Sequence, residues 1–158
     1  MCRPLPRGGG MQVAKKRLSV ELDDAALQAL DEHAREEGES REDAAARLLE
    51  EGLRMAKHPG VFFRTEPAGR RPVLMGGPDV WMVARLFRDL PLDSDEAIEH
   101  AADHAVTLLS SVPRHMMLAA IHYYIEYHDE IDEWMRILDA ESEEAKAKWL
   151  RERELQRA

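Results

Sequence analysis

The sequence predicts a mainly α-helical fold with short β-elements, and three features of the 158-residue chain support this prediction. Polar and apolar side chains alternate over residues 16–22, two helical patterns follow, and Pro and Gly then bound two short apolar runs ahead of further helices. We expect a disordered tail at 1–14, an N-terminal unit at 15–57, a second unit at 58–138 and a charged amphipathic helix at 139–158.

The alternating segment has an apolar side and a polar side, because successive side chains of a strand point to opposite faces. Its apolar side chains are Leu18, Val20 and Leu22. A single strand of this length is not stable alone. We therefore expect it to pair with the same strand of a second chain, which leaves the polar side of the ribbon free to contact base edges in the DNA major groove.

Two capped helices are expected after this strand. Asp23 is a suitable N-cap for a helix at 24–37 that ends at Gly38, and Ser40 is a suitable N-cap for a helix at 41–57. The apolar residues of the second helix are expected to face the first helix and a symmetry mate: Ala45, Leu48, Leu49, Leu53 and Met55. Because some forty residues bury too little area alone, this unit is expected to dimerise.

Residues 16–56, with the sequence KRLSVELDDAALQALDEHAREEGESREDAAARLLEEGLRMA, resemble the ribbon-helix-helix domains of the CopG/Arc/MetJ type. The resemblance implies a homodimer that binds double-stranded operator DNA, with base contacts from the polar side of the strand and phosphate contacts at the amide end of the second helix. The expected DNA-binding residues are Lys16, Arg17, Ser19, Glu21, Ser40 and Arg41.

Charge argues partly against DNA binding. The formal net charge is −9, and most of the negative charge follows residue 57, whereas Lys16 and Arg17 belong to a basic patch that precedes the first acidic residue. Glu21 is repelled by phosphates, and Glu42 and Asp43 compete for the amide end of the second helix. The alternative is a ribbon that only dimerises.

The second unit is predicted to begin where Pro59 and Gly60 stop the second helix. A β-hairpin is expected next, followed by a helix at 80–90, a helix at 95–109 capped by Ser94, and a long helix that starts at Pro113. The hairpin is expected to have strands at 61–64 and 72–75, a turn at 66–69 and a closing Gly-Gly-Pro at 76–78.

Two segments of this unit, HPGVFFRTEPAGRRPVLMGGPDVW and AAIHYYIEYHDEIDEWM, resemble the C-terminal domain of VapB-type antitoxin-like proteins. The resemblance implies a small helix-turn-helix-like domain and a PIN-like ribonuclease toxin as a partner. Together with the ribbon it implies the antitoxin of a toxin-antitoxin pair, which represses its own promoter. A stand-alone transcriptional regulator or an adaptor without a toxin remains the alternative.

The C-terminal helix carries apolar residues at helical spacing that include two tryptophans. We expect partner contacts from Trp134, Leu138 and Trp149. The alternative is that these side chains pack on their own domain or on the other chain of the dimer.

No enzyme, cofactor or metal is expected. His100 and His104 are four residues apart on one predicted helix, which leaves a metal-dependent enzyme as an alternative, but there is no H-E-x-x-H motif and no cysteine pair. The single cysteine, Cys2, and the absence of an export signal or a long apolar stretch indicate a cytoplasmic protein without a membrane span, for which Met11 is an alternative start.

Overall fold

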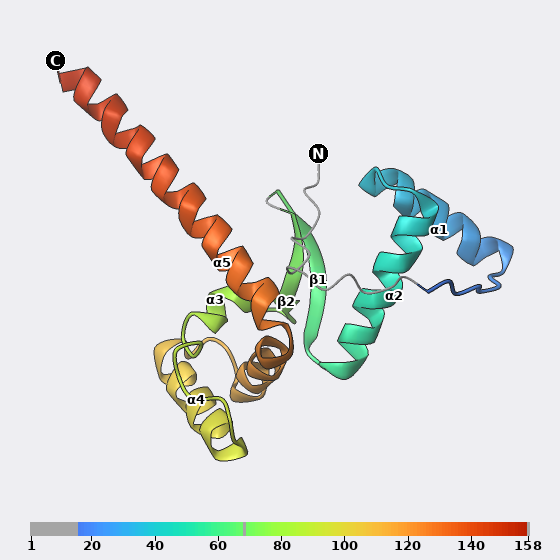
Figure 1. The fold of residues 1–158 in the computed structure, drawn as a ribbon, viewed down its shortest axis with the longest axis horizontal. Coiled ribbons are helices and arrows are strands. Elements are labelled where there is room, and N and C mark those ends of the chain that lie inside the picture. The colour runs from blue at the N-terminus through green and yellow to red at the C-terminus, as the bar shows by residue number, and fades with distance from the viewer. Residues whose placement is uncertain (1–15, 68, 158) are drawn as a thin grey trace.

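The computed structural model describes residues 16–67 and 69–157. The predicted tail at 1–14 and the alternative start at Met11 lie outside these residues. The helices and strands are, in chain order, α1 (Asp24–Glu37), α2 (Arg41–Lys57), β1 (Val61–Glu66), β2 (Gly69–Leu74), α3 (Val80–Ala84), α4 (Asp95–Leu108) and α5 (Arg114–Arg157) (Figure 1). The described chain is therefore mostly helical with one two-stranded antiparallel sheet, as predicted.

Local caps fix the first two helices at the predicted bounds. The Asp23 carboxylate accepts a hydrogen bond from the Ala26 N–H at 2.7 Å, and Gly38 ends α1 in the left-handed region at φ 71°. The Ser40 hydroxyl accepts from the Asp43 N–H at 3.1 Å and begins α2. These contacts lie within four residues of one another along the chain, so the sequence alone defines them.

The hairpin is longer than predicted. β1 pairs with β2 from Val61↔Leu74 to Glu66↔Gly69, so the ladder continues through the polar pairs close to the turn. Apolar patterning misses these pairs, because their stability comes from backbone hydrogen bonds. The hairpin lies between α2 on one side and the helices α3 and α5 on the other (Figure 1).

The helix expected at 80–90 is much shorter in the structure. α3 ends at Ala84, and the chain continues with hydrogen bonds of the i+3 type, from Leu86 N–H to the Val83 carbonyl and from Phe87 N–H to the Ala84 carbonyl. Tight turns of this kind replace the α-helix because they bury Phe87 completely and because Pro91 disfavours a helical conformation for the preceding residue.

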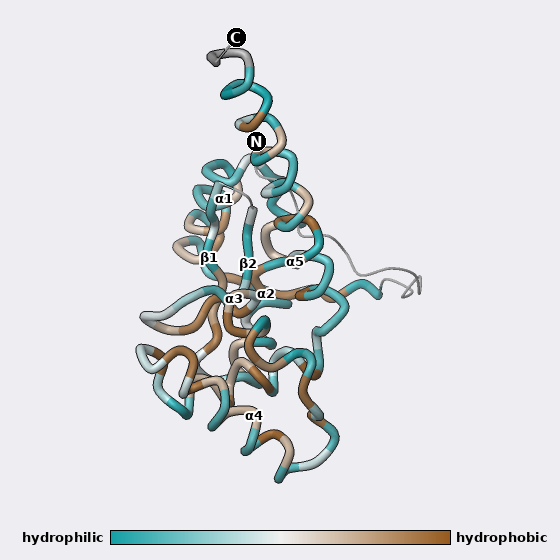
Figure 2. The backbone as a smooth tube through the Cα atoms, turned by 90° about the vertical axis from the view of Figure 1, so that its left-hand side faces the viewer, coloured by the Kyte–Doolittle hydropathy of each residue, from teal (hydrophilic) through white to brown (hydrophobic). Residues whose placement is uncertain are grey.

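The main hydrophobic core lies in the second half of the chain. It is formed by the hairpin, α3, α4 and the first half of α5, and no described residue of α1 or α2 belongs to it. Its completely buried side chains include Phe87, Met117, Ile121 and Tyr123. Figure 2 shows that the end of α5 near the C-terminus is mostly hydrophilic, in contrast to the part around α3 and α4.

Helix α5 is interrupted once and continues across residue 138. Pro113 directly precedes it, as predicted, and Tyr127 has non-helical angles of φ −121° and ψ 31°. Ser94 caps α4, also as predicted. No helix of the described residues is both long enough and apolar enough to cross a membrane.

A buried arginine joins α2 to α5. The Arg54 guanidinium donates hydrogen bonds to the Tyr123 hydroxyl at 3.0 Å and to the Glu130 carboxylate at 2.9 Å, and it lies 4.2 Å from the centre of the Tyr127 ring. Both charged side chains are little exposed, at 14% for Arg54 and 13% for Glu130. Burial raises the pKa of Glu130, and Arg54 opposes that rise. The Arg54 guanidinium therefore compensates the cost of burying the Glu130 carboxylate at the contact between α2 and α5.

We predict that Arg54→Met destabilises the protein by about 3 kcal/mol at neutral pH, because it leaves the Glu130 carboxylate buried without a partner. Loss of the cation raises the pKa of Glu130 further above its ordinary value of 4.5. A folded-state pKa that is raised costs stability as the pH rises, so the loss should be smaller at pH 5 than at pH 8. Urea unfolding of both proteins at the two pH values measures this difference.

The exposed Arg35→Met on α1 is the matched control and should change the free energy of unfolding by less than about 0.5 kcal/mol. The double variant Arg54→Met/Glu130→Gln should recover part of the loss. An equal loss at both pH values would contradict the role assigned to Glu130.

Candidate nucleic-acid interface

Residues 16–22 precede α1 and form no β-strand in the single chain. The predicted strand is absent because a strand needs a hydrogen-bonded neighbour, and no other segment of the described residues pairs with this one. Its apolar side is open to solvent, with Leu18 67% and Val20 65% exposed. The apolar row that the alternation predicts to be buried is therefore exposed, and no other segment of the described residues covers it.

The polar side of the segment is equally open. Its side chains are those of Arg17, Ser19 and Glu21, with Lys16 directly before them, and all four residues are exposed. No hydrogen bond or ion pair joins these side chains to another described residue. These four side chains therefore have no hydrogen-bond or ion-pair partner among the described residues.

Helix α2 has its charged side turned inward and its apolar side turned outward. Glu51 is buried and accepts a two-pronged contact from Arg70 of β2, at 2.6 and 2.7 Å, while Arg54 contacts α5. In contrast, the apolar side chains that the sequence predicts to be buried are exposed in the single chain: Ala45, Leu48, Leu49, Leu53 and Met55. The prediction that these side chains pack against α1 is wrong, because α1 and α2 bury only Ala34 and Ala44 among the residues of their apolar faces.

The amide end of α2 is occupied by its own acids and by an ion pair. Besides accepting from the Asp43 N–H, the Ser40 hydroxyl donates to the Asp43 carboxylate at 2.8 Å. The Arg41 guanidinium donates two hydrogen bonds to Asp31 of α1, at 2.5 and 2.6 Å. The bond from Arg41 lowers the pKa of Asp31 and raises that of Arg41. Arg41 is therefore at the expected place but is held by a carboxylate rather than free for a phosphate.

Comparison with known families addresses this half of the chain. Residues 16–53 match the family model of the ribbon-helix-helix proteins of the copG family. No curated protein and no solved structure is significantly similar to the chain. The ribbon-helix-helix match covers residues 16–23, α1 and most of α2, so this part of the chain is similar to a family of DNA-binding proteins that usually act as dimers.

The residues expected to contact a protein partner lie in different surroundings. Trp134 is only 3% exposed, which corrects the expectation that it anchors a partner, because a buried side chain offers no surface. Its indole N–H is also buried and has no hydrogen-bond partner among the described residues. Leu138 is half-buried, and Trp149 is 51% exposed on the projecting end of α5. Only Trp149 combines an aromatic surface with free access.

The histidine pair of α4 has no further ligand. Within residues 16–67 and 69–157 no group of three or more His, Cys, Asp or Glu side chains is close enough to hold a metal ion. Beside His100 and His104, Arg114 of α5 pairs with Asp103 at 2.6 Å and with Glu99. The carboxylates nearest in sequence to the histidines thus neutralise an arginine.

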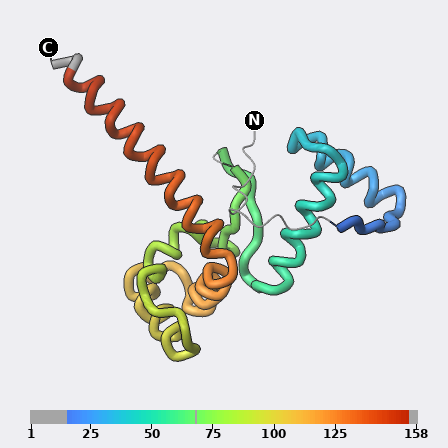
Figure 3. Tube along the Cα trace, viewed as in Figure 1, coloured from blue at the N-terminus to red at the C-terminus, as the bar shows by residue number. Residues whose placement is uncertain are grey.

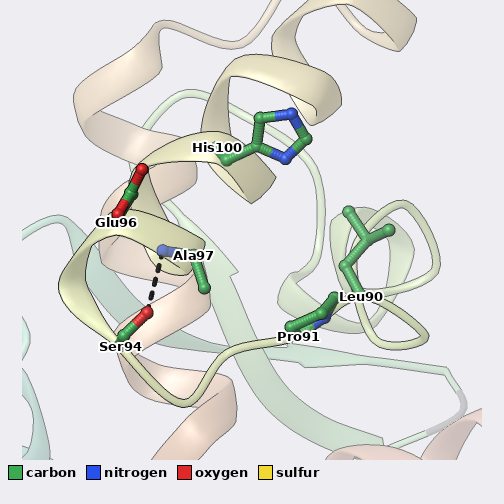
Figure 4. A pocket seen from close by; sticks show the side chains of 6 residues that line it. All are labelled: Leu90, Pro91, Ser94, Glu96, Ala97 and His100. Carbon is green, nitrogen blue, oxygen red and sulfur yellow. Dashed lines mark hydrogen bonds between the residues drawn. The ribbon is translucent and has the colours of Figure 1, made fainter.

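A shallow pocket of about 310 Å³ lies at the start of α4 (Figure 4). Its lining includes one histidine and one glutamate, His100 and Glu96. The Ser94 hydroxyl in this pocket accepts the Ala97 N–H at 3.2 Å and caps the helix. Its polar groups are those of a helix start, without a nucleophile placed beside a base.

Two ion pairs near the amide end of α2 were not predicted from the sequence. The Asp31–Arg41 pair spans the turn between α1 and α2, and its only signal is two opposite charges that flank a capped turn. Arg47 pairs with Glu39 across the same turn and lies 3.1 Å from the His33 ring nitrogen. These pairs decide which basic side chains near the amide end of α2 are free.

We predict that Asp31→Asn strengthens binding to operator DNA several-fold, because it releases the Arg41 guanidinium for phosphate contact at the amide end of α2. The salt dependence of binding should also become steeper, by about one unit of slope for one added phosphate contact. Mobility shifts over a series of salt concentrations measure both quantities.

Glu32→Gln is the matched control, because it removes the same charge from the neighbouring exposed residue without freeing an arginine. An equal gain from both variants would show that general charge, and not Arg41, is responsible. No gain from Asp31→Asn would remove Arg41 from the interface.

Proposed function

We propose that the protein is a homodimeric transcriptional regulator in which two copies of residues 16–22 pair as an antiparallel ribbon and enter the major groove of operator DNA. The observation that carries the proposal is the exposed alternation of this segment, which has a free apolar row and a free polar row, inside the region that matches the ribbon-helix-helix family. The match supplies the class of function, and the side chains supply the mechanism.

Pairing explains the apolar surface. Each chain exposes Leu18, Val20 and Leu22 together with the outer side of α2, and burial of one such side chain contributes roughly 1.5 kcal/mol or more. A second copy of the ribbon also supplies partners for the backbone N–H and C=O groups of the segment. Both contributions favour two chains over one.

The polar side of the paired ribbon then provides the contacts to DNA. Arg17 donates a two-pronged contact to guanine, Ser19 donates or accepts, and Glu21 accepts from the amino group of cytosine. Lys16 and the amide end of α2 at Ser40 bind phosphates. Arg41 joins them once it leaves Asp31. Because the whole chain is acidic, the affinity for DNA depends on these few basic residues of the ribbon and of the start of α2.

We predict that Arg17→Ala weakens binding to the native upstream region at least tenfold and lowers the salt slope by about one. Arg35→Ala removes the same charge from the exposed last turn of α1 and should have little effect. Mobility shifts of the three proteins at two salt concentrations measure this. If the wild type and Arg17→Ala bind equally at both, the ribbon does not contact DNA.

A change on the apolar side tests the dimer separately. Val20→Lys places a charge in the row that the second copy would cover, so the variant should lose DNA binding while its helical circular dichroism is kept. Ala29→Lys is the control, because it adds the same charge at an exposed position of α1 outside the ribbon. Unchanged DNA binding by Val20→Lys would overturn the ribbon as the dimer contact.

The second candidate function is that of an antitoxin that represses its own promoter and neutralises a PIN-like endoribonuclease. It is favoured by the exposed acids at the start of α4, Asp95 and Glu96, because an acidic surface suits the cationic face of an RNA-binding toxin. This role implies that the second unit is the VapB-like, helix-turn-helix-like domain. A stand-alone regulator or adaptor is the alternative.

Co-expression with the product of the adjacent reading frame distinguishes these candidates. An antitoxin should co-purify with that product and inhibit its ribonuclease activity, and Asp95→Lys/Glu96→Lys should weaken both effects. If no adjacent product binds the full-length protein, the regulator without a toxin is supported.

A further inference from the structure

The end of α5 projects from the body of the molecule. Figures 1 and 3 show this part of the helix, coloured red, leading away from all other elements. Every residue from 139 to 154 is exposed; Asp139 pairs with Arg85 of the body, and Lys146 pairs with Glu143 within the stretch. About four turns of helix thus extend with little contact to the rest of the chain.

One side of this helix continues a buried face. Ile131 and Trp134 are buried in the body of the molecule, and Leu138 is half-buried. The helical repeat of 3.6 residues places Ala145 and Trp149 on the same side, farther along the axis. The buried stripe therefore continues into solvent as an apolar stripe with a small residue in the middle and an exposed tryptophan beyond it.

The charges of the projecting end are divided between its two halves. The first half, residues 139–145, has four acidic residues and no basic one. The next half, residues 146–153, has four basic residues and a single acidic one. Such a helix repels a parallel copy of itself, because like charges would lie side by side, and it attracts an antiparallel copy.

We propose that the projecting end of α5 pairs antiparallel with the same segment of a second copy of this chain. The pair is centred near Lys146, a register that places Glu144 of one copy opposite Lys148 of the other and Glu141 opposite Arg151. These four side chains lie on the same flank of the apolar stripe, as an antiparallel pair requires.

The apolar stripe fits the same register. Trp149 of one copy lies along the axis between Ser142 and Ala145 of the other, and the small Ala145 allows the two helices to approach closely. The tryptophan ring, which Arg153 covers at 4.7 Å in the single chain, is then buried twice in the symmetric contact. This contact is independent of the proposed pairing of residues 16–22, which lies at the other end of the chain.

Crosslinking of full-length protein tests the proposal. Two variants, Glu141→Cys and Arg151→Cys, both in a Cys2→Ser background, are mixed and treated with a short bismaleimide. Antiparallel pairing predicts a crosslink between the two different variants and little within either one, because identical positions are about 15 Å apart along the axis. Asp93→Cys, exposed on another part of the molecule, replaces Glu141→Cys in the control mixture.

Charge reversal makes the test specific. Lys148→Glu in both partners places acid opposite Glu144, so the crosslink yield should fall several-fold, and adding Glu144→Lys should restore it. Crosslinks within each single variant would indicate a parallel pair and overturn the proposal. A crosslink yield no higher than in the control mixture would also overturn the proposal. So would the absence of crosslinks together with a different protein whose co-purification requires Trp149.

The Val20→Lys variant separates this contact from the proposed function. If the ribbon forms the DNA-binding dimer, Val20→Lys loses DNA binding but keeps the crosslink between positions 141 and 151. If DNA binding is absent from the start, the crosslink is still expected.

Discussion

The structure depends on one buried cation. Arg54 of α2 is enclosed by Tyr123, Tyr127 and Glu130 of α5, and this contact, with that of Glu51 and Arg70, turns one side of α2 toward the rest of the chain. The charged side is turned inward, so the apolar side with Leu49 and Leu53 is turned outward. Among the described residues, no apolar side chain of α2 belongs to the main hydrophobic core. The apolar surface on which the proposed pairing rests therefore follows from an interaction that has nothing to do with DNA.

The sequence predicts the elements that depend on neighbours along the chain. The bounds of α1 and α2 match the prediction because Asp23, Gly38 and Ser40 act within one helical turn of where they stand. The hairpin and the start of α5 are also local, since they follow from glycine and proline. The alternation also predicted the polar row of Arg17, Ser19 and Glu21; this row is exposed, but so is the apolar row beside it, and contact with DNA stays a prediction.

Features that depend on distant contacts were not predicted. Arg54 and Glu130 are 76 residues apart, and no periodicity indicates that they meet. The shortening of the helix at 80–90 follows from the burial of Phe87, and the burial of Trp134 follows from the side of α5 that faces the body. Asp31 and Arg41 are closer in sequence, but their pairing depends on the angle between two helices. Each case is decided by packing, which a one-dimensional pattern does not contain.

The irregular backbone at Tyr127 has a mechanical consequence. About thirty residues of helix follow it, which corresponds to a rigid rod of roughly 45 Å. Its first part is held in the core through Ile131 and Met135, so the angle at Tyr127 sets the direction of the exposed end at residues 139–154. The ring of Tyr127 is also the surface on which the Arg54 guanidinium stacks, 4.2 Å away. Tyr127 is thus both the irregular residue of α5 and part of the contact between α2 and α5. A change that disturbs this contact would therefore also change the direction of the exposed end of α5.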